Sequence, residues 1–173
     1  MDLLELLSAD HHNLEGVKTP GLVKAALEHI WVERELLHPA IHEYVDGGGA
    51  IVDGMLSLDD RLEDRLAEFE EATGAETEQT GEASREAAVE AEAEVRSVIS
   101  EHIGMQEELF PTLRESIPPE RLVELAEGVP LAIGGAPTRP HAGRSEGFLG
   151  EIAEDLTAAA DHLRDMFHRR ERD

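Results

Sequence analysis

The sequence predicts an all-α protein: an up-and-down four-helix bundle followed by a C-terminal extension helix. Three observations lead to this fold class. Aromatic residues are scarce among the 173 residues, so the core must consist mostly of aliphatic side chains and alanine, which favours helices over a β-sandwich. Apolar residues recur with a helical period, and no segment shows the strict alternation of a strand. The helical segments are separated by mostly short breaks rich in glycine or proline.

Ordinary start and stop signals delimit the four helices of the bundle. Gly16 ends the first, and Thr19-Pro20 opens the second with threonine as N-cap and proline at the first helical position. Glycines 47–49 end the second helix, and residues 73–82 read as a loop of Gly, Thr and Glu. The four expected helices cover residues 3–13, 19–44, 51–72 and 82–114.

A short fifth helix is expected over residues 119–127, because Pro119-Glu120 is a good helix start. We expect the bundle to occupy residues 1–135 and a Pro/Gly-rich linker to occupy 136–147. An amphipathic helix then covers 148–173, and it would pack on the bundle or mediate contact with a second copy or a protein partner. Its apolar stripe consists of Phe148, Ile152, Leu156, Ala159, Leu163 and Phe167.

Charge and cysteine content exclude several classes of function. The formal net charge is −24, so neither duplex nucleic acid nor an anionic membrane surface is an expected partner. The chain has no cysteine, which excludes disulfides and thiolate metal sites. No apolar stretch approaches the ~20 residues of a membrane span, and the first residues lack the basic start of a signal peptide. A cytoplasmic location is therefore expected.

The acidic composition also predicts a stability that depends on salt. Only two of the 15 basic residues are lysines, Lys18 and Lys24, and such acid-rich, lysine-poor chains suit the cytoplasm of a salt-loving organism. Added ions screen the repulsion among the carboxylates. We expect the melting temperature to rise between low and molar potassium chloride, and an unchanged value would count against this interpretation.

The first two helices each place ionisable residues on their apolar faces. With about 100° per residue, His11 falls between Leu4 and Leu7 and points inward. His29 and Glu33 lie four residues apart in the middle of the apolar stripe of the second helix, so they stack on one face. An unpaired buried charge is very costly, so these side chains need either a shared proton or a metal ion.

The third and fourth helices add further inward donors. Asp59 lies at the inner edge of the third-helix stripe, with Glu63 one turn further on, and His102 lies near the centre of the fourth-helix stripe. His38 and His42 fall on the opposite face of the second helix, where a polar surface or a weak surface metal site is expected. Each of the four helices thus offers an inward donor, which is how bundles hold metal ions.

Several short strings, in this order and spacing, resemble the hemerythrin/HHE cation-binding family. They are Asp10-His11, His29-x-x-x-Glu33 with Leu37-His38-Pro39-Ala40, Leu66-Ala-Glu-Phe-Glu, Leu109-Phe110-Pro111-x-Leu113 and the tail string Ala136-Pro137-Thr138-Arg139-Pro140-His141. The resemblance implies an up-and-down four-helix bundle around a non-haem di-iron centre that binds dioxygen, or senses oxygen or iron, or handles NO or peroxide. It further implies that His11, His29 and a bridging Glu33 hold one iron.

The second half of the centre departs from the family pattern. Asp59 stands where the family has a third-helix histidine. Counted back from the Phe-Pro string, the fourth-helix ligand positions hold Glu101 and Met105, whereas His102 is one residue late and is followed by Glu107. Periodicity places His102 inward and family register places Glu101 there, so the sequence leaves both open, and a helix bulge would reconcile them. Oxygen-rich ligands suit harder ions such as Fe(III), Mn(II) or Mg(II).

These residues predict a non-haem iron-binding protein that binds or senses dioxygen, NO or iron. Oxygen carriage is disfavoured because family carriers rely on a histidine-rich site. The candidate ligands are His11, His29, Glu33, Asp59, Glu101 and His102, holding one or two metal ions. We do not expect an enzyme, since no nucleophile elbow or phosphate-binding loop is present. Two alternatives stay open at this point: a metal-free structural or interaction module, and a di-metal oxidase or peroxidase.

Overall fold

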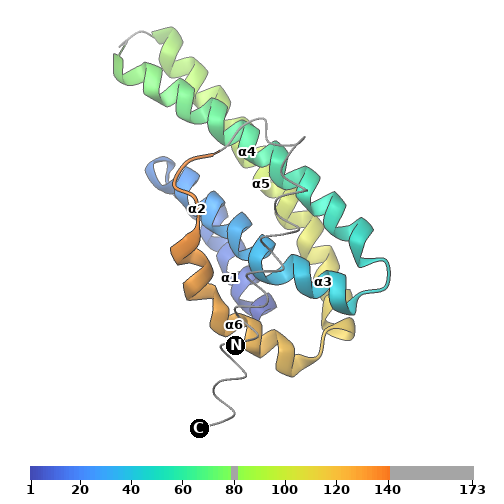
Figure 1. Ribbon diagram of the computed structural model, residues 1–173. Coiled ribbons are helices and arrows are strands. Elements are labelled where there is room, and N and C mark those ends of the chain that lie inside the picture. The colour runs from blue at the N-terminus through green and yellow to red at the C-terminus, as the bar shows by residue number, and fades with distance from the viewer. Residues whose placement is uncertain (79–81, 141–173) are drawn as a thin grey trace. The chain divides into compact units, whose positions relative to one another are not determined.

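The computed structural model describes residues 1–78 and 82–140, and these residues are helical with no strand. The all-α prediction is therefore confirmed for this part of the chain. The helices belong to one compact unit, Met1–Ala142. The elements in Figure 1 are α1 (Leu3–Gly16), α2 (Thr19–Val32), the π-helical segment η1 (Glu33–Leu37), α3 (His38–Tyr44), α4 (Gly48–Glu78), α5 (Glu82–Ser116) and α6 (Pro119–Gly135). The extension helix expected over 148–173 lies outside the described residues.

Several helix ends differ from the sequence predictions. Thr19 is not the N-cap but the first residue of α2, and its hydroxyl donates to Glu92 Oε2 at 3.0 Å. The expected loop over 73–82 is wrong through residue 78, because α4 continues to Glu78. The helix expected over 119–127 continues through Pro130 to Gly135. Polar composition alone therefore did not mark the end of a helix that neighbouring helices stabilise by packing.

A tight turn between α3 and α4 fixes how the chain passes from one helix to the next. Gly47 has a φ of 73°, in the left-handed region that glycine adopts without steric cost. A Cβ at Gly48 would lie 2.3 Å from the carbonyl oxygen of Ile41, so only glycine fits there. The predicted end of the second helix at Tyr44 is confirmed, but Gly48 and Gly49 already belong to α4, which begins before the predicted residue 51.

The helix predicted as one rod over 19–44 contains a π-helical segment. In η1 the His38 N–H donates to the Glu33 carbonyl, an i→i+5 bond that adds one residue to the turn. Pro39 follows directly; it has no N–H and its ring crowds the carbonyl four residues earlier, which disfavours a regular α-helix here. One extra residue rotates everything after it by about 100°. As a result, His38 is buried, whereas His42 remains exposed.

Two apolar clusters form the core, and a polar layer lies at or next to the point where α1, α2, α4 and α5 each pass from one cluster to the other. One cluster contains Leu3, Leu4, Leu7, Val32, Leu36, Leu37, Ala40, Ile41, Val52, Met55, Phe110, Leu113, Ile117, Leu122, Leu125 and Ala132. The other contains Leu14, Leu22, Ala26, Leu27, Ile30, Leu58, Leu62, Leu66, Phe69, Val95, Val98 and Ile99. The chain meets the first cluster before the second along α1 and α4, and in the reverse order along α2 and α5. Inward polar residues are thus flanked by aliphatic packing on both sides.

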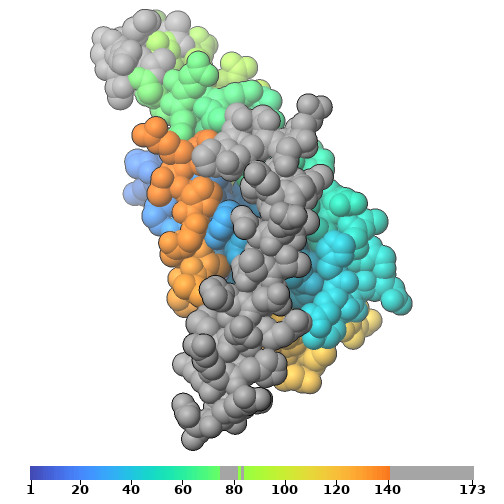
Figure 2. Space-filling view, in the orientation of Figure 1, coloured from blue at the N-terminus to red at the C-terminus, as the bar shows by residue number. Residues whose placement is uncertain are grey.

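The remaining helices close the core. α4 and α5 lie side by side over much of their length, and α6 packs against α1, α2 and η1. In the space-filling view α6, in orange, lies against the blue N-terminal helices (Figure 2). None of the described helices is both long and apolar enough to cross a membrane.

Candidate metal centre

All the buried polar and charged side chains of the described residues belong to the polar layer between the two apolar clusters. They are His11, His29, Glu33, Arg34, His38, Asp59, His102 and Gln106. Two groups within this layer have donor atoms close enough to share a metal ion, and Glu33 belongs to both. The layer is therefore one connected set of ligand-type side chains.

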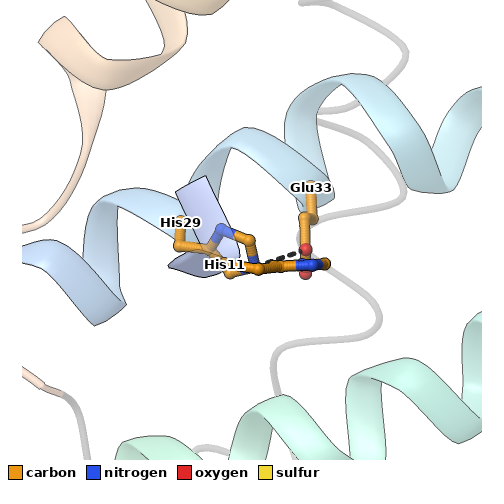
Figure 3. A group of neighbouring side chains, drawn as sticks. All are labelled: His11, His29 and Glu33. Atoms are coloured by element: carbon orange, nitrogen blue, oxygen red, sulfur yellow. Dashed lines mark ion pairs between the residues drawn. The ribbon is translucent and has the colours of Figure 1, made fainter. Parts of the chain in front are cut away.

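The first group consists of His11, His29 and Glu33, whose donor atoms all lie within 4.8 Å of one another. Figure 3 shows His29 and Glu33 projecting from one helix while His11 reaches the same point from another. His29 Nε2 lies 2.7 Å from Glu33 Oε1. The centroids of the His11 and His29 rings lie 5.0 Å apart, and the two rings meet edge to face. These are the three residues to which the family resemblance assigned one iron.

Both histidines of the first group are held from behind by carboxylates at the protein surface. Asp10 Oδ2 lies 2.9 Å from Nδ1 of His29, and Glu107 Oε1 lies 2.7 Å from Nδ1 of His11. These contacts favour a proton on each Nδ1. The Nε2 of His29 faces Glu33, whereas the Nε2 of His11 lies 3.0 Å from the amide oxygen of Gln106. Such carboxylate–histidine pairs are the usual outer support of metal-binding imidazoles.

The second group consists of Glu33, His38 and Asp59, again within 4.8 Å of one another. His102 joins the two groups, with Nε2 at 3.1 Å from Glu33 Oε2 and Nδ1 at 3.3 Å from Asp59 Oδ1. The Gln106 amide lies between two rings, 3.0 Å from Nε2 of His11 and 3.0 Å from Nε2 of His102. An amide both donates and accepts, so it can serve one imidazole in each role.

A buried arginine borders the second group. Arg34 Nε lies 3.2 Å from Asp59 Oδ2, and its terminal nitrogens lie 2.6 Å from Glu63 Oε1 and 3.3 Å from Asp60 Oδ1. Burial alone would lower the pKa of the Arg34 guanidinium, but these carboxylates raise it, so the side chain remains charged. No role for Arg34 was predicted from the sequence.

The donor atoms of the layer fit a metal ion better than they fit one another. Among the described residues, five buried side-chain atoms of the layer have no aligned hydrogen-bond partner: His29 Nε2, Glu33 Oε2, His38 Nε2, Asp59 Oδ1 and His102 Nδ1. Several lie at ion-pair distance from an opposite charge but without hydrogen-bond geometry. Buried polar atoms are nearly always paired, so a cluster of orphaned atoms of ligand type calls for an explanation. A cation bound between His29 and Glu33 would satisfy the two orphaned atoms of the first group, His29 Nε2 and Glu33 Oε2.

Electrostatics divide the histidines into two kinds. Burial lowers the pKa of His29 and His102, but the charge of Glu33, together with Asp10 for His29 and Asp59 for His102, outweighs it and raises their pKa values to about 9 and about 10. Burial also lowers the pKa of His38, and there it prevails. Burial would raise the pKa of Glu33, but the adjacent imidazolium groups hold it well below its usual value.

Periodicity placed the inward residues correctly, and family register did not. His11, His29, Glu33, Asp59 and His102 are all buried in the layer. The placement of Glu101 at the site is wrong: its carboxylate is exposed and pairs with Arg61 at 2.8 Å, because His102 one residue later takes the inward position. No bulge in α5 is needed to reconcile the two.

Five contributors to the site were not predicted as site residues. His38, Arg34 and Gln106 are buried in the layer, and Asp10 and Glu107 support its histidines from the surface. His38 had a visible signal, since the Pro39 that follows it interrupts a predicted helix. The inward placement of Gln106, nearer the centre of its stripe than Met105, was also readable from periodicity.

Searches against protein-family models, curated proteins and solved structures find no match for the chain.

Proposed function

We propose that the chain is a hemerythrin-like, non-haem iron-binding protein with an up-and-down four-helix bundle, which binds or senses dioxygen, NO or iron. The observation that carries the proposal is the convergence of His11, His29 and Glu33 in a dry layer. Each imidazole turns its Nε2 inward and is held at Nδ1 by its own carboxylate. Two imidazoles and a carboxylate form a donor set that suits Fe(II).

The order of residues along the helices supports the bundle topology. Successive long helices pass from one apolar cluster through the polar layer to the other in alternating directions. Such an arrangement brings one inward donor from each of α1, α2, α4 and α5 to the same level. It matches the way up-and-down bundles build metal sites in their cores.

Bound iron would supply an open coordination position for a diatomic ligand or a change of redox state that a partner could read. The chain's own residues would orient the ligands and exclude water: the two apolar clusters flank the layer, and Phe110 stacks on His11 with ring centroids 5.7 Å apart. Oxygen carriage is not proposed, because Asp59, paired with Arg34, stands where the family's carriers have a third-helix histidine.

Metal content tests the proposal directly. Protein purified in molar salt without chelator should contain iron by elemental analysis, or take up Fe(II) anaerobically, and should develop charge-transfer absorption in air. Zero metal in a well-folded chain that also refuses added Fe(II) would overturn the proposal. That result would leave a structural or interaction module whose imidazoles serve only in ion pairs.

A further inference from the structure

We infer that Arg34 is an internal cation that takes the place of a second metal ion, so that the chain holds one metal ion, in the group of His11, His29 and Glu33. The inference rests on the proposed function and specifies its stoichiometry. It starts from a conflict within the layer, since the second group of Glu33, His38 and Asp59 also has donor atoms within 4.8 Å. Its surroundings decide whether it can take an ion.

Each carboxylate oxygen of Asp59 already lies at ion-pair distance from a basic group. Its Oδ2 contacts the Arg34 guanidinium at 3.2 Å, and its Oδ1 faces His102 Nδ1 at 3.3 Å. A metal ion on Oδ1 would displace His102 and stand close to a fixed positive charge in a medium of low dielectric. Repulsion between like charges is weakly screened there, so the second ion is strongly disfavoured.

Arg34 cannot easily move away to make room. Its guanidinium also contacts Glu63 and Asp60, and the side chain is largely buried. A planar guanidinium that serves three carboxylates is fixed by geometry as well as by charge. If Arg34 moved away from these carboxylates, the fully buried Asp59 would keep an uncompensated negative charge.

The charges in the layer balance for one metal ion. Glu33 and Asp59 are 0% exposed, and the Glu63 side chain is 13% exposed, so three carboxylates with little solvent carry three negative charges. Arg34 supplies one positive charge, and one divalent ion supplies two. A second divalent ion would leave an excess of two positive charges in the interior, which is very costly.

The same geometry gives Asp59 a positioning role. Asp10 supports His29 and Glu107 supports His11, in each case at Nδ1. Asp59 faces Nδ1 of His102 in the same sense, with Nε2 of that ring toward Glu33. Asp59 therefore supports His102 from behind and is itself held by Arg34. The sequence predicted Asp59 as a metal ligand, and this geometry assigns it a positioning role instead.

Counting bound Co(II) tests the inference. The full chain is dialysed against excess Co(II) in molar potassium chloride, which screens adventitious binding to the acidic surface. We expect one ion per chain for the unaltered protein and two for Arg34→Met, with Arg34→Lys remaining at one. Arg61→Met is the matched control: it removes an arginine charge from an exposed pair with Glu101 and should also stay at one.

Asp59→Asn keeps the test decisive if Arg34→Met does not fold. With Asp59 behind His102, which is not a ligand of the single ion, both the unaltered chain and Asp59→Asn bind one ion, and the affinity of the variant changes by less than the ~10-fold that loss of a ligand's own outer support costs. Two ions in the unaltered chain, or one ion in a folded Arg34→Met, would overturn the inference alone. No ion in the unaltered chain would overturn the proposed function itself.

Discussion

Replacing Glu33 by glutamine should abolish metal binding, with a loss of affinity of well over 100-fold. Glu33 is the one side chain shared by both groups of donor atoms, and its two oxygens face His29 and His102 respectively. An amide has one oxygen, carries no charge and presents N–H groups where a cation would need a donor. Loss of an outer residue that supports a ligand already lowers metal affinity by about 10- to 100-fold, and loss of the shared ligand itself lowers it further.

Glu101→Gln is the matched control for this substitution. It removes the same carboxylate charge from a residue that family register placed at the site, but that carboxylate is exposed and pairs with Arg61. Its affinity for Fe(II) or Co(II) should equal that of the unaltered chain. Anaerobic titration of the three proteins, followed by absorption, measures the difference.

The Glu33 variant is expected to remain folded, though less stable. The substitution removes the main charge that keeps His29 and His102 protonated, so burial then favours their neutral forms and leaves no unpaired imidazolium in the interior. Circular dichroism and thermal melting check this before affinities are compared. Retained affinity in a folded Glu33→Gln, or equal losses in both variants, would contradict the assignment.

Helical periodicity was enough to find the inward residues that lie on regular helix. His11, Asp59 and His102 each occupy the position computed at about 100° per residue, because the backbone on either side of them is uninterrupted. The fourth helix shows how strong this constraint is. Register taken from the Phe-Pro string pointed to Glu101, one residue away, and packing of the apolar stripe against the core decided for His102.

The same arithmetic failed where the backbone changes its period. His38 was placed on the surface because the segment from Thr19 to Tyr44 was treated as one α-helix. The π-helical η1 adds a residue just before His38 and turns the ring into the layer. A proline following it was the local sign, but proline also ends or kinks helices, so the sequence did not say which.

The contacts of long polar side chains were the second feature that the sequence could not predict. Arg34 directly follows Glu33, and periodicity says only that its Cα lies off the centre of the stripe. Its guanidinium reaches across to Asp59, Glu63 and Asp60 on α4. Which carboxylates meet an arginine depends on the distance and rotation between two helices, and neither quantity can be read from the spacing of residues along one chain. The difference between two metal ions and one metal ion with a guanidinium depends on that contact.

Metal affinity should rise steeply with pH, by about 100-fold per pH unit between pH 6 and 8. In the metal-free protein His29 and His102 have pKa values raised to about 9 and about 10, so both are protonated throughout this range. A metal ion binds the neutral imidazole, so His29 must lose its proton. His102 lies 3.1 Å from Glu33, and a cation on that carboxylate offsets the larger of the two charges, Glu33 and Asp59, that keep His102 protonated.

The release of two protons per metal ion accounts for the expected slope of metal affinity against pH and for the pH at which that slope flattens. Below pH 9 each pH unit makes loss of two protons about 100-fold easier, and the slope flattens only as pH passes the raised pKa values. One divalent ion then replaces two positive charges, so the layer keeps the same net charge when metal binds. Glu33, whose pKa is lowered, stays ionised over the whole range and adds nothing to the slope.

Calorimetric titration with Co(II) in buffers of different ionisation enthalpy counts these protons without reference to activity. His12→Gln is the matched control, since His12 is the exposed neighbour of His11 and its loss should leave the count at two. His29→Gln removes one proton-releasing group and a ligand, so any residual binding should release fewer protons. An affinity independent of pH in the unaltered chain would mean that His29 binds no metal, and the first group would then serve only as an ion-paired layer of the core.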